Sequence, residues 1–177
     1  MIRGVFLDRD GVINEACIRD GKPFPPRNLS EVKILHGVDS ALAQLRSTGW
    51  RTIVITNQPD VRRGLASQSD VEAINNYLMS QLCIDDFRVC YHDDSDRCQC
   101  RKPLPGAILK AGYDHGILIS ESFMIGDRWR DIEAGHAAGC KTIFIDYKYK
   151  EKSPQNPDYT VNNLVEAVKI INKNENH

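Results

Sequence analysis

Short apolar runs recur along the chain, and three of them end in a side chain that carries oxygen. The run VFL is followed by Asp8, TIVIT ends at Thr56, and SFMIGD ends at Asp127. Apolar runs without polar alternation are typical of strands that are buried on both faces of a parallel sheet. FRVCYH and KTIFID are further candidate strands. The chain is therefore expected to contain a buried parallel sheet.

Segments with helical periodicity separate these runs. Apolar residues recur at helical spacing between Val38 and Leu45. SQSDVEAINNYLMSQL has an apolar stripe and a capping box formed by Ser69 and Glu72. Further helices are expected over 105–115, 129–138 and 161–172. Because right-handed crossovers join strands that alternate with helices, the pattern predicts a doubly wound α/β fold, a parallel sheet with helices on both faces.

The length and charge of the chain restrict what it can bind. Its 177 residues are expected to form a single domain over 1–177, with exposed loops at 90–100 and, before the C-terminal helix, at 147–158. Its 23 basic and 24 acidic residues are interleaved, which argues against a nucleic-acid-binding face or a membrane-seeking patch. The opening MIRGVFLDRDG has too few apolar residues for a signal peptide. We expect a cytoplasmic monomer whose partners are small molecules.

The polar residues at the strand ends are expected to meet, because ligands of such folds bind beyond the carboxyl ends of the strands. Asp8 and Asp10 follow the first strand, and Thr56 and Asp127 end two others. A D-x-D pair by itself also fits an ordinary acidic turn. The presence of Thr56, Lys102 and Asp127 in addition to this pair indicates phosphate chemistry instead.

Phosphate-ester hydrolysis accounts for this set of groups. An ionised Asp8 could attack phosphorus and form an acyl phosphate. Each negative charge on the phosphate repels this carboxylate by about 1 kcal/mol at ~4 Å in water, and by more in a dry site. Mg²⁺ held by carboxylates, together with Lys102, would offset that repulsion. Thr56 could bond the phosphoryl oxygens, and Asp10 could protonate the leaving oxygen and then activate water.

A second cluster of metal-binding residue types lies in the loop at 90–100. The pattern C-x-H-x5-C-x-C is formed by Cys90, His92, Cys98 and Cys100. Tetrahedral Zn²⁺ takes ligands of this number and type. The alternative is three thiols with an unrelated histidine, and a disulfide is disfavoured in a reducing compartment. Zn²⁺ would order this polar loop and direct Arg101 and Lys102 into the crevice.

Four segments, in this order, resemble the motifs of the haloacid dehalogenase (HAD) superfamily of phosphatases. They are DRDGVIN, the end of the strand TIVIT, the pair KP at 102–103, and GDRWRD. The resemblance implies that Asp8 is the nucleophile and a Mg²⁺ ligand. It implies that Asp10 is the acid/base and offers its backbone carbonyl to Mg²⁺, and that Asp127 is the third protein ligand.

The same resemblance assigns supporting roles to three other side chains. Thr56 and Lys102 would hold phosphate, and Asp131 would support the metal site from the next helical turn. HAD phosphatases that act on small molecules often carry a separate cap domain between their motifs. The intervals between the motifs are too short for one here, so we expect a capless domain with an open site.

A capless domain with a zinc loop that ends in CRKP resembles two branches of the superfamily. These are the D-glycero-D-manno-heptose 1,7-bisphosphate 7-phosphatases and the histidinol-phosphate phosphatases. TNQPDVRRG is closer to the heptose branch, although Pro59-Asp60 replaces its usual Ser-Gly pair, whereas GDR also fits the histidinol-phosphate branch. The resemblance suggests as substrate contacts Asn57, Gln58, Arg63, Arg101 and Arg128.

Other functions stay open at this stage. The same enzyme could act on histidinol phosphate or another small phosphomonoester. A receiver-type phosphoacceptor domain also gathers carboxylates, Thr and Lys around Mg²⁺, but its phosphorylated Asp ends a middle strand, where this chain has Thr56. A zinc-stabilised nucleic-acid-binding module would need a basic stripe that the sequence lacks. We expect a Mg²⁺-dependent phosphatase that acts on heptose 1,7-bisphosphate.

Overall fold

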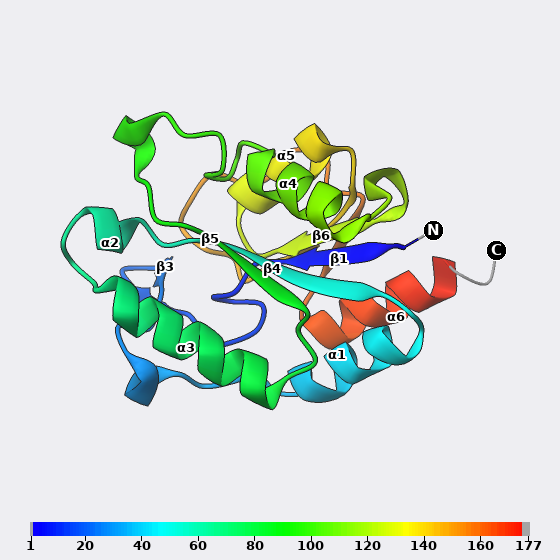
Figure 1. The fold of residues 1–177 in the computed structure, drawn as a ribbon, viewed down its shortest axis with the longest axis horizontal. Coiled ribbons are helices and arrows are strands. Elements are labelled where there is room, and N and C mark those ends of the chain that lie inside the picture. The colour runs from blue at the N-terminus through cyan, green and yellow to red at the C-terminus, as the bar shows by residue number, and fades with distance from the viewer. Residues whose placement is uncertain (1, 175–177) are drawn as a thin grey trace.

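A computed structural model describes residues 2–174 and confirms the expected parallel sheet. Six strands form one sheet in the order β5-β4-β1-β6-β7-β8, and each neighbouring pair is parallel (Figure 1). The strands are β1 (Gly4–Leu7), β4 (Arg51–Asn57), β5 (Asp86–Cys90), β6 (Phe123–Gly126), β7 (Lys141–Ile145) and β8 (Tyr159–Val161). The last of these is not evident from the sequence, because three residues carry too little periodicity.

Helices cover both faces of the sheet, as predicted. On one face lie α1 (Val38–Ser47), α3 (Gln68–Gln81) and α6 (Leu164–Asn174), and on the other lie α4 (Gly106–His115) and α5 (Trp129–Ala138) (Figure 1). The predicted capping box of α3 is wrong by two residues. The helix is capped by Ser67, whose side chain accepts a hydrogen bond from the backbone N–H of Asp70. Ser67 and Ser69 both precede the apolar stripe, so the sequence alone does not show which of them caps the helix.

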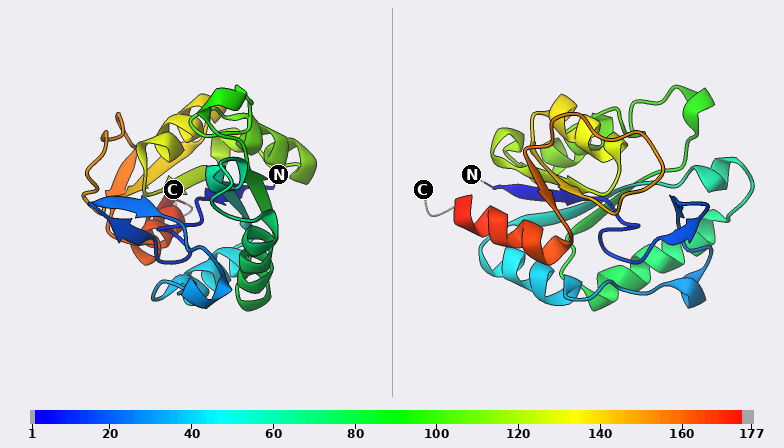
Figure 2. Two further views of the ribbon diagram at one scale, coloured as in Figure 1. Left: turned by 90° about the vertical axis from the view of Figure 1, so that its left-hand side faces the viewer. Right: turned by 180° about the vertical axis from the view of Figure 1, so that it is seen from behind.

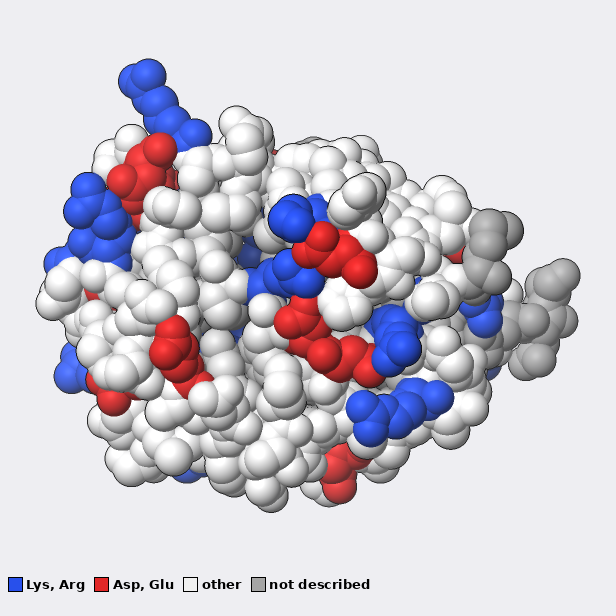
Figure 3. Space-filling model, viewed as in Figure 1, with Lys and Arg blue, Asp and Glu red and all other residues white. Residues whose placement is uncertain are grey.

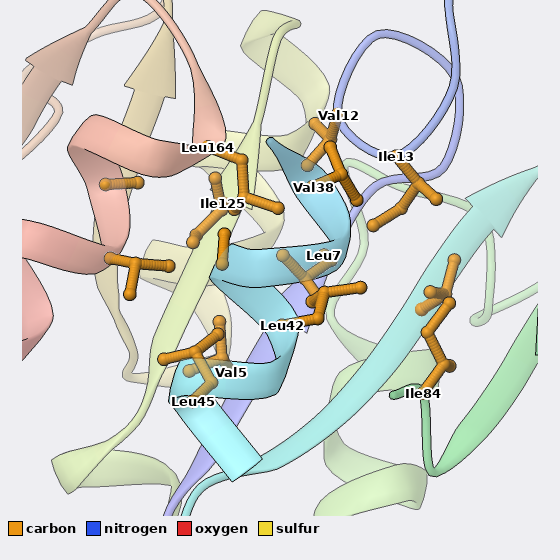
Figure 4. Close-up of a cluster of buried hydrophobic side chains, with 14 of the residues drawn as sticks. Val5, Leu7, Val12, Ile13, Val38, Leu42, Leu45, Ile84, Ile125 and Leu164 are labelled. Atoms are coloured by element: carbon orange, nitrogen blue, oxygen red, sulfur yellow. The ribbon is translucent and has the colours of Figure 1, made fainter. Parts of the chain in front are cut away.

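The two faces of β1 pack into different cores. Val5 and Leu7 belong to the cluster that contains Leu42 and Leu164, and Figure 4 shows these side chains together. Phe6 belongs to the cluster on the opposite face, which α4 and α5 cover. Burial on both sides explains why the strand sequence shows no polar alternation.

The order of the strands places a crevice beside β1. The chain runs from β1 outward to β4 and β5, then returns through α4 on the other face to β6, which pairs with β1 on its free side. Ligands bind at such a reversal of strand order. Asp8 directly follows β1, and its backbone N–H donates to the carbonyl oxygen of Ile125 in β6 at 2.9 Å.

Short elements surround the carboxyl ends of the strands. The segment between Asp10 and α1 contains an antiparallel hairpin of β2 (Cys17–Arg19) and β3 (Lys22–Phe24), in place of a cap domain. The short helix α2 (Pro59–Arg62) follows β4, and in Figures 1 and 2 it lies at the same end of the molecule as the hairpin. On the face seen in Figure 3, acidic and basic side chains are intermingled. Every helix in the described range is too short or too polar to cross a membrane.

Candidate active site

Lys102 links three segments that are distant in sequence. Its ammonium group donates to Oδ1 of Asp8 at 2.8 Å and to the carbonyl oxygen of Ile55 at 2.6 Å. It also forms an ion pair with Oδ1 of Asp131 at 2.7 Å. The lysine side chain is 2 % exposed, so these partners replace water around the charge. The structure therefore brings Lys102 into contact with the predicted nucleophile.

Three carboxylates lie close together in this site. Asp8, Asp127 and Asp131 each place one oxygen within 4.8 Å of the others. Both oxygens of Asp131 are occupied, one by Lys102 and one by the backbone N–H of Arg128 at 3.0 Å. Oδ1 of Asp127, in contrast, is buried without a hydrogen-bond partner. Excess negative charge and an unpartnered carboxylate oxygen are features of a site that can hold a divalent cation.

Burial and mutual repulsion disturb the ionisation of this cluster. Burial raises the pKa of Asp8 to about 6, although the neighbouring Lys102 acts in the opposite direction. Burial, with the charges of Asp8 and Asp131, raises the pKa of Asp127 well above its ordinary value. Burial alone would lower the pKa of Lys102, but the carboxylates of Asp131 and Asp8 raise it. The lysine is therefore a permanent cation at neutral pH.

Gly11 allows the first acidic loop to approach Asp127. Its φ of +91° lies in the left-handed region, and a Cβ atom at this position would lie 2.0 Å from Oδ2 of Asp127. A larger residue would push the two loops apart. The glycine in DRDG is therefore required by the packing of the acidic cluster as well as by the turn.

The carboxylate of Asp10 is held by several donors. It accepts hydrogen bonds from Arg9 at 3.1 and 3.2 Å, from Asn14 at 3.0 Å and from Gln58 at 2.9 Å. The Arg9 side chain is fully buried, and it also donates to Asn75 of α3 at 2.9 Å. Sequence reasoning missed Arg9 because an arginine between two acids looks like a solvated residue.

The residues after β4 support their neighbours. The hydroxyl of Thr56 is buried and accepts from Gln58 at 2.9 Å, so Gln58 connects it to Asp10. The Asn57 side chain donates to the backbone carbonyl of Lys102 at 3.0 Å and accepts from its N–H at 3.1 Å. These two hydrogen bonds hold the backbone of Lys102 in place.

A pocket lies over these groups. Its lining includes Asp8, Asp10, Asn57, Lys102 and Asp131. Arg128 and Arg130 add cationic side chains, and residues 23–25 of the hairpin contribute Pro, Phe and Pro. Neither Arg130 nor the hairpin was predicted from the sequence to line the site. The arginine follows Arg128 by two residues at the start of α5, which is the signal that could have identified it.

Three predicted substrate contacts lie outside this lining: Gln58, which bonds Asp10 and Thr56 as described above, Arg101 and Arg63. Arg101 donates to Oδ1 of Asp94 at 2.9 Å and to the carbonyl oxygen of His92 at 3.3 Å, so its side chain is directed into the 90–100 loop. The guanidinium group of Arg63 forms ion pairs with Oδ1 of Asp60 at 3.6 Å and with Oδ2 of Asp93 at 4.0 Å. Arg101 thus bonds groups within the 90–100 loop, and Arg63 connects this loop to α2.

The 90–100 loop brings its four predicted ligands together. The Sγ atoms of Cys90, Cys98 and Cys100 lie 3.2 to 3.6 Å from one another. Nδ1 of His92 lies 3.5 Å from Sγ of Cys90 and 3.4 Å from that of Cys100. Zn–S bonds of about 2.3 Å in a tetrahedron place sulfur atoms roughly 3.8 Å apart, so the cluster has nearly the size of a zinc site. All six cysteines are free thiols.

The loop after β7 also reaches the acidic cluster. The hydroxyl group of Tyr149 donates to Oδ2 of Asp127 at 2.8 Å, and that of Tyr147 donates to the backbone carbonyl of Gly11 at 2.9 Å. Glu151 accepts from Nε of Arg128 at 3.1 Å. This stretch belongs to the loop predicted over 147–158. No role was predicted for Tyr147 or Tyr149, because neither belongs to a recognised motif.

Comparison with known proteins agrees with this geometry. Residues 99–167 match the HAD-hydrolase-like family model. The chain is 34% identical over 158 residues to a D-glycero-beta-D-manno-heptose-1,7-bisphosphate 7-phosphatase of Helicobacter pylori, covering 86% of this chain and 88% of that protein. It is 38% identical over 154 residues to the corresponding alpha-heptose enzyme of Mycobacterium bovis, covering 80% of this chain and 78% of that protein.

A solved structure extends the similarity to almost the whole chain. It is the D,D-heptose 1,7-bisphosphate phosphatase from B. bronchiseptica, complexed with magnesium and phosphate. The TM-score is 0.83 at 26% identity, and the match covers 98% of this chain and 99% of the other.

Proposed function

Because the chain belongs to the family of HAD-like phosphatases that includes the heptose-1,7-bisphosphate 7-phosphatases, we propose that it removes the 7-phosphate of D-glycero-D-manno-heptose 1,7-bisphosphate. The contact of Lys102 with both Asp8 and Asp131 carries the phosphatase part of the proposal. The heptose part is supported by the names of the relatives.

Asp8 is the proposed nucleophile. One of its oxygens is held by Lys102, which orients the carboxylate at the end of β1. Attack on phosphorus forms an acyl phosphate on Asp8 and releases the sugar oxygen, and water then hydrolyses the acyl phosphate. Lys102 and Thr56 are proposed to bind the phosphoryl oxygens as charge develops on them.

Asp8, Asp127 and the backbone carbonyl of Asp10 are the proposed ligands of Mg²⁺. The carboxylate excess and the unpartnered Oδ1 of Asp127 fit an oxygen-seeking divalent cation. When bound, Mg²⁺ would offset the repulsion between the nucleophile and the phosphate. Asp131 is assigned a supporting role, because Lys102 and a backbone amide occupy its oxygens.

Asp10 is the proposed acid and base. It lines the pocket, where it can donate a proton to the leaving sugar oxygen and later accept one from water. Arg9 and Gln58 hold this carboxylate beside the nucleophile. At the pocket wall, Arg128 and Arg130 offer cationic groups for a second phosphate. Asn57, Gln58, Arg63 and Arg101 are proposed to act mainly by holding the loops that form the site.

A panel of phosphate esters tests this function. We expect phosphate release in Mg²⁺ to be fastest with one anomer of heptose 1,7-bisphosphate, and at least about tenfold slower with histidinol phosphate, because a pocket built for a second anionic group leaves its cations unpaired with the smaller substrate. Measured kcat/KM values for both anomers and histidinol phosphate decide the matter. A preference for histidinol phosphate would assign the chain to the other branch.

We further propose that Cys90, His92, Cys98 and Cys100 hold one structural Zn²⁺. Elemental analysis of protein never exposed to chelator should give about one zinc per chain, because the four ligand atoms already lie at nearly tetrahedral spacing. A Cys98→Ser/Cys100→Ser variant should lose the metal and unfold at lower temperature, since zinc binding contributes folding energy. Cys17→Ser, outside the cluster, should keep it. Zinc-free wild-type protein would contradict the assignment.

The setting of the enzyme is part of the same proposal. The substrate is a small phosphate ester, which needs neither a nucleic acid nor a membrane as partner. We propose a single-domain monomer in the cytoplasm, where reducing conditions keep the cysteines available as metal ligands.

A further inference from the structure

The 147–151 segment, YKYKE, directs alternate side chains at the catalytic loops. The Tyr147 hydroxyl donates a hydrogen bond to the backbone carbonyl of Gly11, in the loop after β1. The Tyr149 hydroxyl donates to the carboxylate of Asp127, and the carboxylate of Glu151 accepts from the side chain of Arg128. The backbone N–H of Lys150 donates to the carbonyl oxygen of Gly21 in the hairpin turn at 2.9 Å. In Figure 2 this orange stretch passes beside the blue hairpin. The segment therefore contacts the hairpin and both acidic loops.

The two oxygens of Asp127 are in different surroundings. Oδ2 accepts from the Tyr149 hydroxyl and lies against Gly11, while Oδ1 is buried and has no partner. Asp127 itself is 1 % exposed, so water does not complete its hydrogen bonds. A carboxylate fixed through one oxygen presents the other in a defined direction.

We propose that Tyr149 is a positioning residue, whose hydroxyl holds Oδ2 of Asp127 so that Oδ1 stays directed toward the divalent cation. The inference rests on the proposed function, because it takes Asp127 as a ligand of Mg²⁺. Groups that hydrogen-bond a metal ligand orient it, and their loss weakens metal binding about 10- to 100-fold.

The ring of Tyr149 has a separate role. It stacks on Tyr147 with ring centroids 5.5 Å apart and an interplanar angle of 30°. Phenylalanine would keep this stacking and remove only the hydrogen bond to Asp127. Tyr149→Phe therefore separates positioning from packing. Tyr113, which is 86 % exposed on α4, provides a matched control for the loss of a hydroxyl group.

The test is a calorimetric titration of Mg²⁺ into wild type, Tyr149→Phe and Tyr113→Phe, each dialysed without chelator so that the Cys/His cluster stays intact. We expect the dissociation constant for Mg²⁺ to rise about tenfold in Tyr149→Phe and to stay unchanged in Tyr113→Phe. The increase in unfolding temperature at a fixed, subsaturating Mg²⁺ concentration should shrink correspondingly. At saturating Mg²⁺, kcat of Tyr149→Phe should recover, because mass action compensates for weaker binding.

The outcomes separate this inference from the proposed function. If Tyr149→Phe binds Mg²⁺ like wild type and only unfolds at lower temperature, with and without Mg²⁺ alike, the residue merely packs and the inference is overturned. If wild type itself binds no Mg²⁺ and releases no phosphate, the proposed function fails and the inference fails with it.

Discussion

Asp8→Asn is expected to abolish Mg²⁺-dependent phosphate release while the protein stays folded. The amide cannot attack phosphorus, and removal of a nucleophile lowers kcat by about 10⁴-fold or more. In the wild-type structure, Nζ of Lys102 donates a hydrogen bond to Oδ1 of Asp8 at 2.8 Å. The amide oxygen of asparagine can accept the same hydrogen bond. Turnover of the heptose bisphosphate by both proteins measures the effect.

The stability of this variant provides the internal control. Because burial raises the pKa of Asp8 to about 6, its charged form is costly in the metal-free protein at pH 7. The unfolding temperature of metal-free Asp8→Asn should therefore be no lower than that of wild type. Asp39→Asn, at an exposed site in the first turn of α1, should keep full activity. Undiminished turnover by Asp8→Asn would exclude Asp8 as the nucleophile.

Lys102→Met should impair both activity and stability. The ammonium group contacts Asp8 and Asp131 in a site that excludes water. Its removal leaves buried carboxylates without a counter-charge, which costs about 3–5 kcal/mol of unfolding free energy. We also expect kcat to fall by about 10²- to 10³-fold, the scale for losing one group that stabilises a transition-state oxyanion. Denaturant unfolding and phosphate release measure the two effects.

The loss of stability in Lys102→Met should depend on pH. Asp8 has a pKa of 3.8 when unfolded and about 6 when folded, so between these values the folded protein binds more protons and its stability falls as pH rises. Without Lys102, which lowers this pKa, the fall extends to higher pH. The deficit relative to wild type should thus be larger at pH 8 than at pH 5.

A lysine on the surface serves as the matched control for this substitution. Lys110 forms an exposed ion pair with Asp114 at 2.7 Å. Lys110→Met should cost less than about 0.5 kcal/mol, because solvent screens the pair. Equal losses in the two lysine variants would contradict the proposed buried role of Lys102.

Most of the fold followed from local pattern, and the errors lie where that pattern is weak. The apolar runs identified five of the six strands of the main sheet, and the helices lie close to their expected ranges. The hairpin β2–β3 was not predicted, because each of its strands has only three residues. The start of α3 was assigned to Ser69 rather than Ser67, since either serine could cap a helix at that point.

The candidate site divides along a similar line. Asp8 and Asp127 were expected to meet because each follows or ends a strand at the same edge of the sheet, and Lys102 was expected to reach them from the end of the 90–100 loop. In the structure, Asp8 lies close to Asp127 and contacts Lys102. Arg9 and Tyr149 were not identified. The first looks like a solvated residue and the second lies in an irregular loop, yet both contact the acidic residues of the site.

The sequence by itself determined which chemical groups stand at the ends of the strands. A buried parallel strand can be identified from a run of consecutive apolar residues. Parallel packing then brings the residues that follow such strands to the same edge of the sheet. Only the tertiary structure decided which oxygen of each acid is occupied: Asp131 by Lys102, and one side of Asp127 by Tyr149. Those partners depend on the paths of loops through space, and no short-range periodicity in a sequence encodes such paths.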